Sequence, residues 1–418
     1  MIDSPIRNNM IMWCERIMML SVCVTVFFIP FSIAALEITF MVMLSAWVVK
    51  RAAQGSWKFH STVLNGPLLV WTIVVMASVI FSQTPALSLT KFFTKFLQDI
   101  LTFFFIVETV NSRRKLCVLI WVFLLSVSLV VFDGVYQLTH AYSFIFHMKN
   151  SGRLTGPLRH ANDFGAYLVM AIPVACCAWV LCRPSLLITK RFFLIALVLT
   201  MAVFLGLTYS RGAWLAFSVS CFLLMIIQKS IKLKVWIIFF LTAFMTVFSF
   251  SLIHNRTDIG KSYDSEIFLN MSDRNRYWKD AFNMSKQYPL FGCGYNAYIE
   301  TLKKKRNPLQ EYPHNCYLHI AAETGFTGLA VFLWFLITFF RQASILPARL
   351  PEPIDRNIAI GFLIGVAAFF VHSGVDTAFS SIQLSTFAWF MMAVITAMSV
   401  HKEFRSVSLR EAKRRSNP

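Results

Sequence analysis

Charged side chains are scarce in this sequence. Asp, Glu, Lys and Arg make up 14% of its 418 residues, whereas hydrophobic residues make up 57%. A soluble globular domain carries about 25% charged residues, so the composition excludes an ordinary soluble protein. Acidic residues are fewer than basic residues: the sequence has 20 Asp and Glu and 39 Lys and Arg. The cations lie in short clusters between long apolar stretches, which is typical of an all-α polytopic membrane protein and not of a protein that binds nucleic acid.

Motifs for a metal or a nucleophile are missing as well. The sequence has no His-Glu-x-x-His pattern and no paired Cys motif, and the spacing of His314 and His319 is poor for joint metal ligation. Nothing resembles a Ser-His-Asp arrangement. The glycine turn in residues 289–296 lacks the strand and the lysine of a nucleotide site. We therefore expect no catalytic metal and no other cofactor.

Apolar stretches recur along the chain and predict about twelve transmembrane helices. They lie near residues 17–35, 36–49, 67–82, 97–110, 116–138, 164–182, 192–209, 212–228, 235–253, 326–340, 358–378 and 383–400. The second and fourth are short for a bilayer core, which needs about 20 residues. The domain organisation that follows is nine helices in 1–253, a loop domain in 254–325, three helices in 326–400, and a basic tail in 401–418.

The distribution of cations predicts the topology, because Lys and Arg accumulate in cytoplasmic loops. The short loops on one side hold few of them, namely Lys91, Lys95, Lys149, Arg153, Arg159 and Arg211. We therefore expect an inner-membrane protein with both termini in the cytoplasm and one large periplasmic loop domain. The first apolar stretch could be a secretory signal, but a second follows at once, which favours an uncleaved span. The basic tail is expected to contact anionic lipid.

Two of the nine cysteines, Cys293 and Cys316, fall in the expected periplasmic segment. That compartment is oxidising, so a disulfide between them is one alternative. Two unpaired buried thiols are the other, since one sequence does not give their separation.

Charged and polar side chains gather at the expected periplasmic ends of the spans. Such residues are candidates for function because burying a charge in a membrane is costly. The set consists of Arg153, Arg159, His160, Asp163, Arg211, His372 and Asp376, and the long loop adds Arg274, Arg276 and His314. An outward-facing polar site is expected.

Arginines in this set are suited to an anionic substrate. Arg211 lies in a short turn between two spans. There it either contacts lipid headgroups or binds a phosphate through two N–H groups of its planar guanidinium. Arg274 and Trp278 are four residues apart and would share one face of a helix. That helix is either a solvated surface element or part of the site.

His314 is the strongest candidate for acid–base chemistry. It precedes a helix that runs into the membrane, and a neutral imidazole there could act as a general base near pH 7. The alternative is a structural histidine held by hydrogen bonds. His372 and Asp376 are four residues apart and could form one polar pair near the end of a span, either structural or part of a proton path.

Four local patterns together resemble the O-antigen ligase and polymerase superfamily of bacterial envelope glycosyltransferases. They are Gly152-Arg153-Leu154-Thr155-Gly156 through Asn162, Ser210-Arg211-Gly212-Ala213-Trp214, Arg274 to Trp278 leading to Pro289-Leu290-Phe291-Gly292-Cys293-Gly294, and His314-Asn315 to Gly325. The resemblance covers roughly residues 150–330. Ala161 departs from it, because relatives often have proline before the asparagine.

The resemblance implies a GT-C-like fold and a metal-independent, inverting O-antigen ligase. The donor would be O-antigen on undecaprenyl pyrophosphate and the acceptor lipid A-core, with His314 as the catalytic base. The pyrophosphate would be bound by Arg211 and Arg274, with Arg276, Arg153 and Arg159 as further candidates. The supporting residues would be Asn162, Asn315, Trp278, His372 and Asp376.

Three alternatives remain open at this point. An O-antigen polymerase would use the same donor, although such relatives often divide their outer mass between two loops. A protein O-oligosaccharyltransferase commonly carries a larger soluble C-terminal part than the 18 residues that follow the last expected span here. An anion or lipid-linked glycan transporter would need polar residues along the bilayer midplane, whereas these cluster at one edge.

Overall fold

The computed structural model describes residues 4–140, 142–147, 152–178, 188–227, 264–304 and 311–406. These ranges are helical and contain no β-strand. The expected span at 235–253 lies outside them, as do residues 254–263 and 407–418. The other expected spans overlap helices, although the stretch at 17–35 crosses the break between the helices Ser4–Phe28 and Ile33–Gln54, and the stretch at 358–378 runs past a helix end at His372.

In chain order the elements are α1 (Ser4–Phe28), α2 (Ile33–Gln54), α3 (Asn65–Ile80), α4 (Pro85–Lys91), the π-helical turn η1 (Phe92–Phe96), α5 (Leu97–Thr109), α6 (Arg113–His140), α7 (Ala161–Ala178), α8 (Ile188–Leu207), α9 (Arg211–Ile227), α11 (Asp264–Gln287), α12 (Tyr298–Lys304), α13 (Cys316–Arg349), α14 (Pro353–His372), the 3-10 turn η3 (Ala378–Ser380), α15 (Ile382–Val400) and α16 (Lys402–Arg405).

Seven of the helices in the described ranges are long and apolar enough to cross a membrane, namely α1, α2, α6, α7, α13, α14 and α15. Helices α3, α8 and α9 contain shorter apolar segments. The two stretches that are short in sequence are completed by neighbouring residues: α2 extends to 22 residues, and α5 continues directly from α4 and η1. The chain is therefore a polytopic all-α membrane protein, as predicted.

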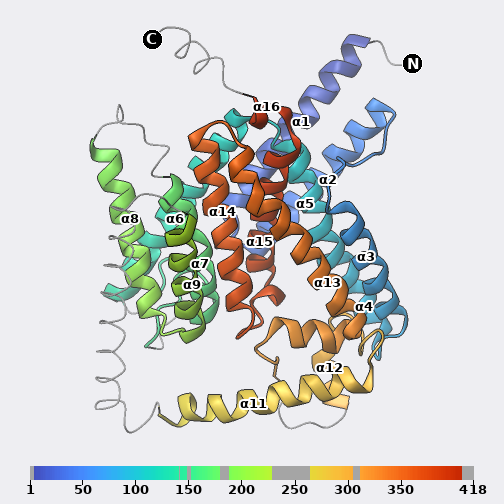
Figure 1. Cartoon of the computed structure of the whole chain (residues 1–418), viewed down its shortest axis with the longest axis vertical. Helices are drawn as coiled ribbons and strands as arrows, with labels where there is room; N and C mark the ends of the chain where they lie inside the picture. The colour runs from blue at the N-terminus through green and yellow to red at the C-terminus, as the bar shows by residue number, and fades with distance from the viewer. Residues whose placement is uncertain are drawn as a thin grey trace.

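The centre of the bundle is formed by α14 and α15 (Figure 1). α14 packs against α7 and α9, and α15 packs against α5. Close approach of α14 to α7 depends on two glycines four residues apart. A Cβ atom at Gly361 would lie 2.9 Å from the Pro173 carbonyl oxygen, and one at Gly365 would lie 2.8 Å from that of Met170. Small residues at this spacing are the usual means by which transmembrane helices pack closely.

Gly325 divides α13 into two helical parts. Its backbone is non-helical, with φ 74° and ψ 177°, and the helix continues on both sides of it. The sequence predicts that the loop domain ends at 325 and a span begins at 326, so that boundary falls on the kink. The residues from Cys316 to the kink are already helical, although they belong to the segment expected as loop.

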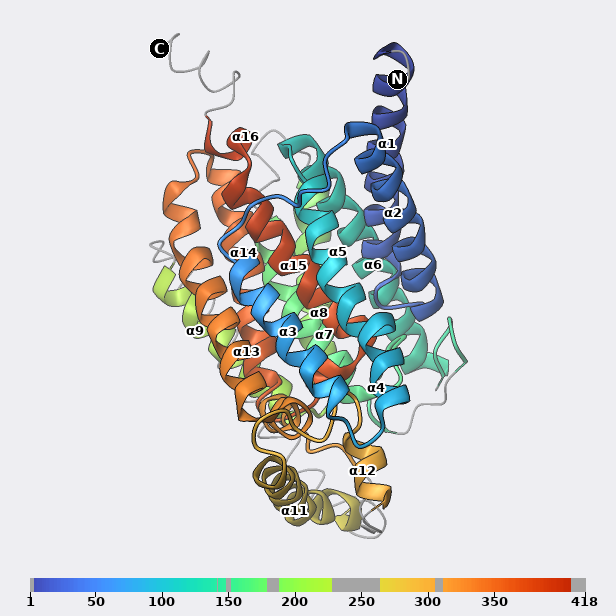
Figure 2. The same cartoon turned by 90° about the vertical axis from the view of Figure 1, so that its right-hand side faces the viewer.

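The bundle has two distinct ends, which Figures 1 and 2 show from two sides. The beginning of α1 and the short α16 lie at one end, here called the terminal end. α11 and α12 lie at the opposite end, here called the loop end, where α11 crosses beneath the bundle.

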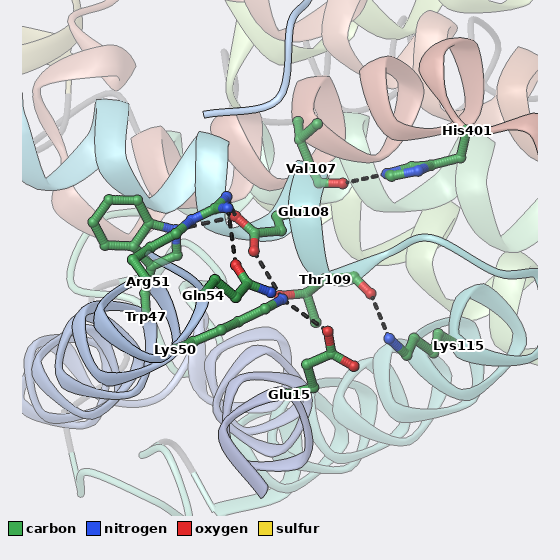
Figure 3. A network of polar contacts seen from close by, with 10 residues as sticks. All are labelled: Glu15, Trp47, Lys50, Arg51, Gln54, Val107, Glu108, Thr109, Lys115 and His401. Carbon is green, nitrogen blue, oxygen red and sulfur yellow. Dashed lines mark hydrogen bonds and ion pairs between the residues drawn. The ribbon is translucent and has the colours of Figure 1, made fainter. Parts of the chain in front are cut away.

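Charges at the terminal end are paired with one another (Figure 3). Lys50 Nζ lies 2.9 Å from Glu15 Oε1 and 2.8 Å from Glu108 Oε1. Glu108 also accepts hydrogen bonds from Arg51 and from the Trp47 indole N–H. Such pairing satisfies charges that would be costly to leave alone in a buried position.

A second set of contacts joins the chain after α15 to this end. Arg113 Nε donates to Asp355 Oδ2 at 2.6 Å, and its Nη2 donates to the carbonyl oxygens of Phe404 and Ser406. His401 Nε2 lies 2.8 Å from the Val107 carbonyl oxygen. α16 is thereby held against α5, α6 and α14.

Candidate functional site

His314 and Asp376 form a hydrogen-bonded pair at the loop end. His314 Nδ1 lies 3.1 Å from Asp376 Oδ1, and the two side chains are 28% and 11% exposed. The sequence expects Asp376 to pair with His372 on one helical face. Instead α14 ends at His372, so Asp376 stands in the following loop and contacts His314.

The start of α13 holds this pair in place. Asn315 caps the helix by accepting from the Leu318 backbone N–H at 3.0 Å, and its side-chain amide donates to the Gly374 carbonyl oxygen at 2.9 Å. The Cys316 N–H donates to the Ser373 carbonyl oxygen at 2.8 Å. The loop that carries Asp376 is therefore fixed against the residue that follows His314.

His314 has a strained backbone. Its φ of 46° is in the left-handed region, which residues other than glycine adopt infrequently. Strained backbone of this kind is found more often at functional sites than elsewhere.

Asp376 is ionised in this environment. Its burial opposes the charged form, but the hydrogen bond to His314, the electrostatic effects of the His372 and His314 rings and the Thr377 N–H outweigh that effect and lower its pKa from 3.8 to about 2. An ionised carboxylate only accepts hydrogen bonds. Nδ1 of His314 must therefore be the donor in this hydrogen bond, so that Nε2 is the ring nitrogen that can accept a proton.

His372 lies next to the N-terminus of α9. A Cβ atom at Gly212 would be 3.6 Å from His372 Nε2 and 2.6 Å from a methyl group of Val375. Arg211, which is exposed, therefore begins its helix beside the loop that carries Asp376. Neither ring nitrogen of His372 has a hydrogen-bond partner among the described residues, although the side chain is 1% exposed.

α11 brings aromatic and cationic side chains to the same place. The rings of Tyr277 and His314 are 6.1 Å apart, and Arg274 interacts electrostatically with His372. Trp278 is partly buried on the same helix, whereas Arg276 is exposed. α11 therefore places Tyr277 beside His314 and Arg274 within electrostatic range of His372.

Asn162 and Arg153 form a separate contact on the neighbouring loop. Arg153 Nη2 donates to Asn162 Oδ1 at 2.7 Å, and its Nε donates to the Thr208 carbonyl oxygen at 2.9 Å. Arg153 therefore supports the turn that leads to Arg211. Asp163 interacts electrostatically with His314 and Asp376.

Two further expected anion-binding arginines lie on the surface. Arg159 and Arg276 are both exposed. Within the described ranges, no hydrogen bond joins either of them to His314, Asp376 or His372.

The glycine turn before α12 has a packing role. A Cβ atom at Gly292 would overlap the backbone of Glu323, and one at Gly325 would overlap the backbone of Leu290. The Phe326 N–H donates to the Pro289 carbonyl oxygen at 2.8 Å across the same contact. Residues 289–294 therefore pack against the kink of α13, away from the end of the helix that follows His314. This contact is called the clasp.

A second polar cluster, formed by Lys95, Asp99, His319, Glu323 and Ser380, lies deeper in the bundle. Lys95 Nζ donates to the Ser380 carbonyl oxygen at 2.6 Å, and Ser380 Oγ lies 3.0 Å from His319 Nδ1. His319 Nε2 is 3.1 Å from Glu323 Oε1. These residues line a cavity of about 50 Å³, enough for a few water molecules. Through Ser380, these residues hold the C-terminal end of the loop that carries Asp376.

Sequence reasoning did not identify this cluster as a unit. From the sequence, Lys95 is identified only as one cation of a short loop, and His319 only as a poor metal ligand. The signal was the presence of Asp99 and Glu323 in apolar surroundings, which indicates buried polar partners. The pairing itself depends on the π-helical turn at Phe92–Phe96, which the pattern does not reveal.

The thiols and the possible metal donors have simple arrangements. Cys293 and Cys316 are buried and free, so they form no disulfide. Within the described ranges, no group of three or more His, Cys, Asp or Glu side chains is placed to hold a metal ion.

Comparison with known proteins gives one family match. Residues 196–333 match the family model described as O-antigen ligase. That segment includes Arg211, Arg274 and His314, whereas Asp376 and Arg153 lie outside it. No curated protein matches the chain.

Proposed function

We propose that this chain, which carries an O-antigen ligase family domain at residues 196–333, transfers O-polysaccharide from undecaprenyl pyrophosphate to a sugar hydroxyl of lipid A-core. The donor, the acceptor and the periplasmic side of the reaction are parts of this proposal. The family domain and the multi-pass membrane architecture support it at the level of a transferase that acts on membrane-linked polysaccharide.

The hydrogen bond between His314 and Asp376 carries the mechanistic part of the proposal. It orients the imidazole and leaves Nε2 to take the proton of the acceptor hydroxyl. Asp376 stabilises the imidazolium that forms, because an ionised carboxylate beside a protonated ring is a favourable pair.

The transfer is a single displacement at the anomeric carbon. The acceptor oxygen forms a bond to that carbon as its proton passes to His314, and the bond from the carbon to the pyrophosphate oxygen breaks. Undecaprenyl pyrophosphate departs with the electron pair of that bond. One displacement inverts the anomeric configuration.

Negative charge develops on the departing pyrophosphate and requires cations. Arg211 begins α9 beside the loop that carries Asp376, and Arg274 interacts electrostatically with His372. Fixed guanidinium groups stabilise such charge without reorganisation at the moment of reaction. Arg153 orders the turn before Arg211 through its bond to the Thr208 carbonyl.

Replacement of His314 by alanine tests this function. We expect His314→Ala to insert in the membrane normally and to lower attachment of polysaccharide to lipid A-core by about 10²-fold or more, as for loss of a general base. A strain that lacks the native gene would express each variant, and its envelope glycolipids would be separated on a gel. The matched control is His140→Ala, which removes an exposed histidine at the end of α6.

The same gel separates the proposed ligase from a polymerase. Loss of all ladder bands, with lipid-linked polymer accumulating, is expected for a ligase. A single-repeat band in the deletion strain would indicate a polymerase, and an unchanged glycolipid profile would contradict both. Normal levels of modified lipid A-core with His314→Ala would exclude His314 as the base.

A further inference from the structure

A second cavity lies at the terminal end, on the opposite side of the bundle from His314. Its volume is about 310 Å³, within the range of sites that bind small molecules. The polar part of its lining consists of Ser61, Thr62, Gln342, Arg349, Ser399 and Arg405. These residues come from the loop before α3, the last turns of α13, and the chain at the end of α15 and in α16.

The lining is cationic and contains no acidic residue. Arg405 donates to the Ser399 carbonyl oxygen, and in the part of the chain that the structure describes neither Arg349 nor Arg405 forms an ion pair. Three other cations at this end have carboxylate partners: Lys50 and Arg51 contact Glu108 (Figure 3), and Arg113 contacts Asp355. The pocket therefore holds two positive charges that no side chain of the described protein neutralises.

The remaining walls of the pocket are apolar. Val63, Leu346, Leu350 and Val400 line it, and the adjacent Ile345 is 46% exposed on the outer surface of α13. The pocket stands where α13 and α15 end, which is where a membrane-spanning helix reaches the bilayer boundary. A ligand with an anionic head and apolar chains matches this lining.

We infer that this pocket binds the phosphate headgroup of an anionic phospholipid. Arginine pairs with phosphate through two parallel N–H donors, and the hydroxyl groups of Ser61, Thr62 and Ser399 supply further donors. Basic pockets between transmembrane helices are suited to such headgroups. The site is distinct from the transfer site at the loop end and does not depend on the proposed reaction.

Lipid binding by the full chain tests the inference. The purified protein in detergent would be titrated with phosphatidylglycerol, with phosphatidylcholine, and with inorganic phosphate alone, and retained lipid would be counted by native mass spectrometry. We expect preferential retention of phosphatidylglycerol and about tenfold weaker retention after Arg349→Gln, since a charge-assisted contact is lost. Arg349 is the residue of choice because its side chain is exposed and makes no hydrogen bond within the described ranges.

Arg341→Gln is the matched control, because Arg341 is exposed on the same helix but does not line the pocket. It should retain phosphatidylglycerol as the unaltered chain does. Equal retention by Arg349→Gln and Arg341→Gln would overturn the inference. Equal retention of the two lipids would overturn it too, as would displacement of phosphatidylglycerol by millimolar inorganic phosphate, which would indicate a general phosphate site. Without added lipid, all variants must keep the melting temperature of the unaltered chain. Arg349→Lys is a second variant: it keeps the positive charge and should retain part of the lipid binding.

Discussion

The side chain of His314 depends on Asp376 for both its orientation and its tautomer. The two residues are 62 positions apart in the chain and are joined at 3.1 Å. Asp376 is also fixed through its own loop, where its Oδ1 accepts from the Thr377 backbone N–H at 2.8 Å. This arrangement suits a base whose accepting nitrogen must stay in one place.

Replacement of Asp376 by asparagine should reduce transfer and change the response to low pH. The pKa of Asp376 is lowered from 3.8 to about 2 on folding, so its contribution to stability is complete above pH 3.8 and is lost as the pH falls toward 2. That contribution is on the order of 2 kcal/mol at neutral pH. Thermal unfolding in detergent between pH 2 and pH 7 would measure it.

The variant Asp376→Asn should unfold at a lower temperature at pH 7 and should lose less stability than the unaltered chain below pH 4. A conservative variant, Asp376→Glu, should recover part of the transfer rate. Identical pH profiles for Asp376→Asn and the unaltered chain would contradict the role of the ionised pair.

Lysine in place of Arg211 or Arg274 tests the phosphate-binding role of the planar guanidinium. Each change keeps the positive charge but removes the paired donors, so we expect transfer to fall by about tenfold or more. The glycolipid assay measures it. Arg341→Lys, far from the loop end, is the control, and full activity in both site variants would remove these residues from the proposed mechanism.

Among the elements, the clasp between the 289–294 turn and α13 determines where the site stands. Gly292 and Gly325 lie where their backbones meet, and three hydrogen bonds cross this contact, from Cys293 to Ala322, from Gly294 to Glu323 and from Phe326 to Pro289. The clasp fixes the direction of the first part of α13. That part begins one residue after His314 with the Asn315 cap.

Alanine at Gly325 should open this clasp. A Cβ atom there would overlap Leu290 and lie 2.7 Å from the Phe291 nitrogen, and the φ of 74° is unfavourable for a residue with a side chain. We expect a loss of about 1–3 kcal/mol in stability, measured by thermal unfolding, together with reduced transfer. Gly66→Ala is the control, because no atom lies within 4 Å of a Cβ at that position. An unchanged melting temperature for Gly325→Ala would refute the clasp.

At the scale of the whole molecule, the two ends differ in how their charged side chains are paired. The terminal end pairs Lys50 and Arg51 with Glu108, whose side chain is 9% exposed. The loop end instead gathers histidines, carboxylates and arginines around one polar site. Buried ion pairs between side chains thus stabilise the terminal end, and the proposed chemistry is placed at the loop end.

Replacement of Glu108 by glutamine should destabilise the bundle without touching the loop end. The change leaves two buried cations with less compensation, and breaking such a pair costs about 3 kcal/mol. Thermal unfolding in detergent measures it, and Glu300→Gln is the control because its pair with Lys303 is exposed. Equal melting temperatures for the two variants would show that Glu108 is not structurally required.

Much of the fold was predictable because hydropathy acts locally. Runs of apolar residues identify the helices, and α3 and α15 are found within two residues of the expected bounds. The candidate site was predictable in part, since Arg211, Arg274 and His314 carry recognisable neighbours in the sequence. The partner of His314 was not, because helical spacing favours a pair between His372 and Asp376, and the end of α14 separates them.

The sequence by itself determined that this protein is a bundle of membrane helices whose candidate site residues lie near one set of helix ends, because apolar length and charge are properties of consecutive residues. Only the tertiary structure decided which of those side chains meet. The contact of His314 with Asp376, the clasp at Gly325 and the cluster around Lys95 each join segments far apart in the chain. Their geometry depends on where helices end and kink, which is set by packing between helices and not by the pattern within any one of them.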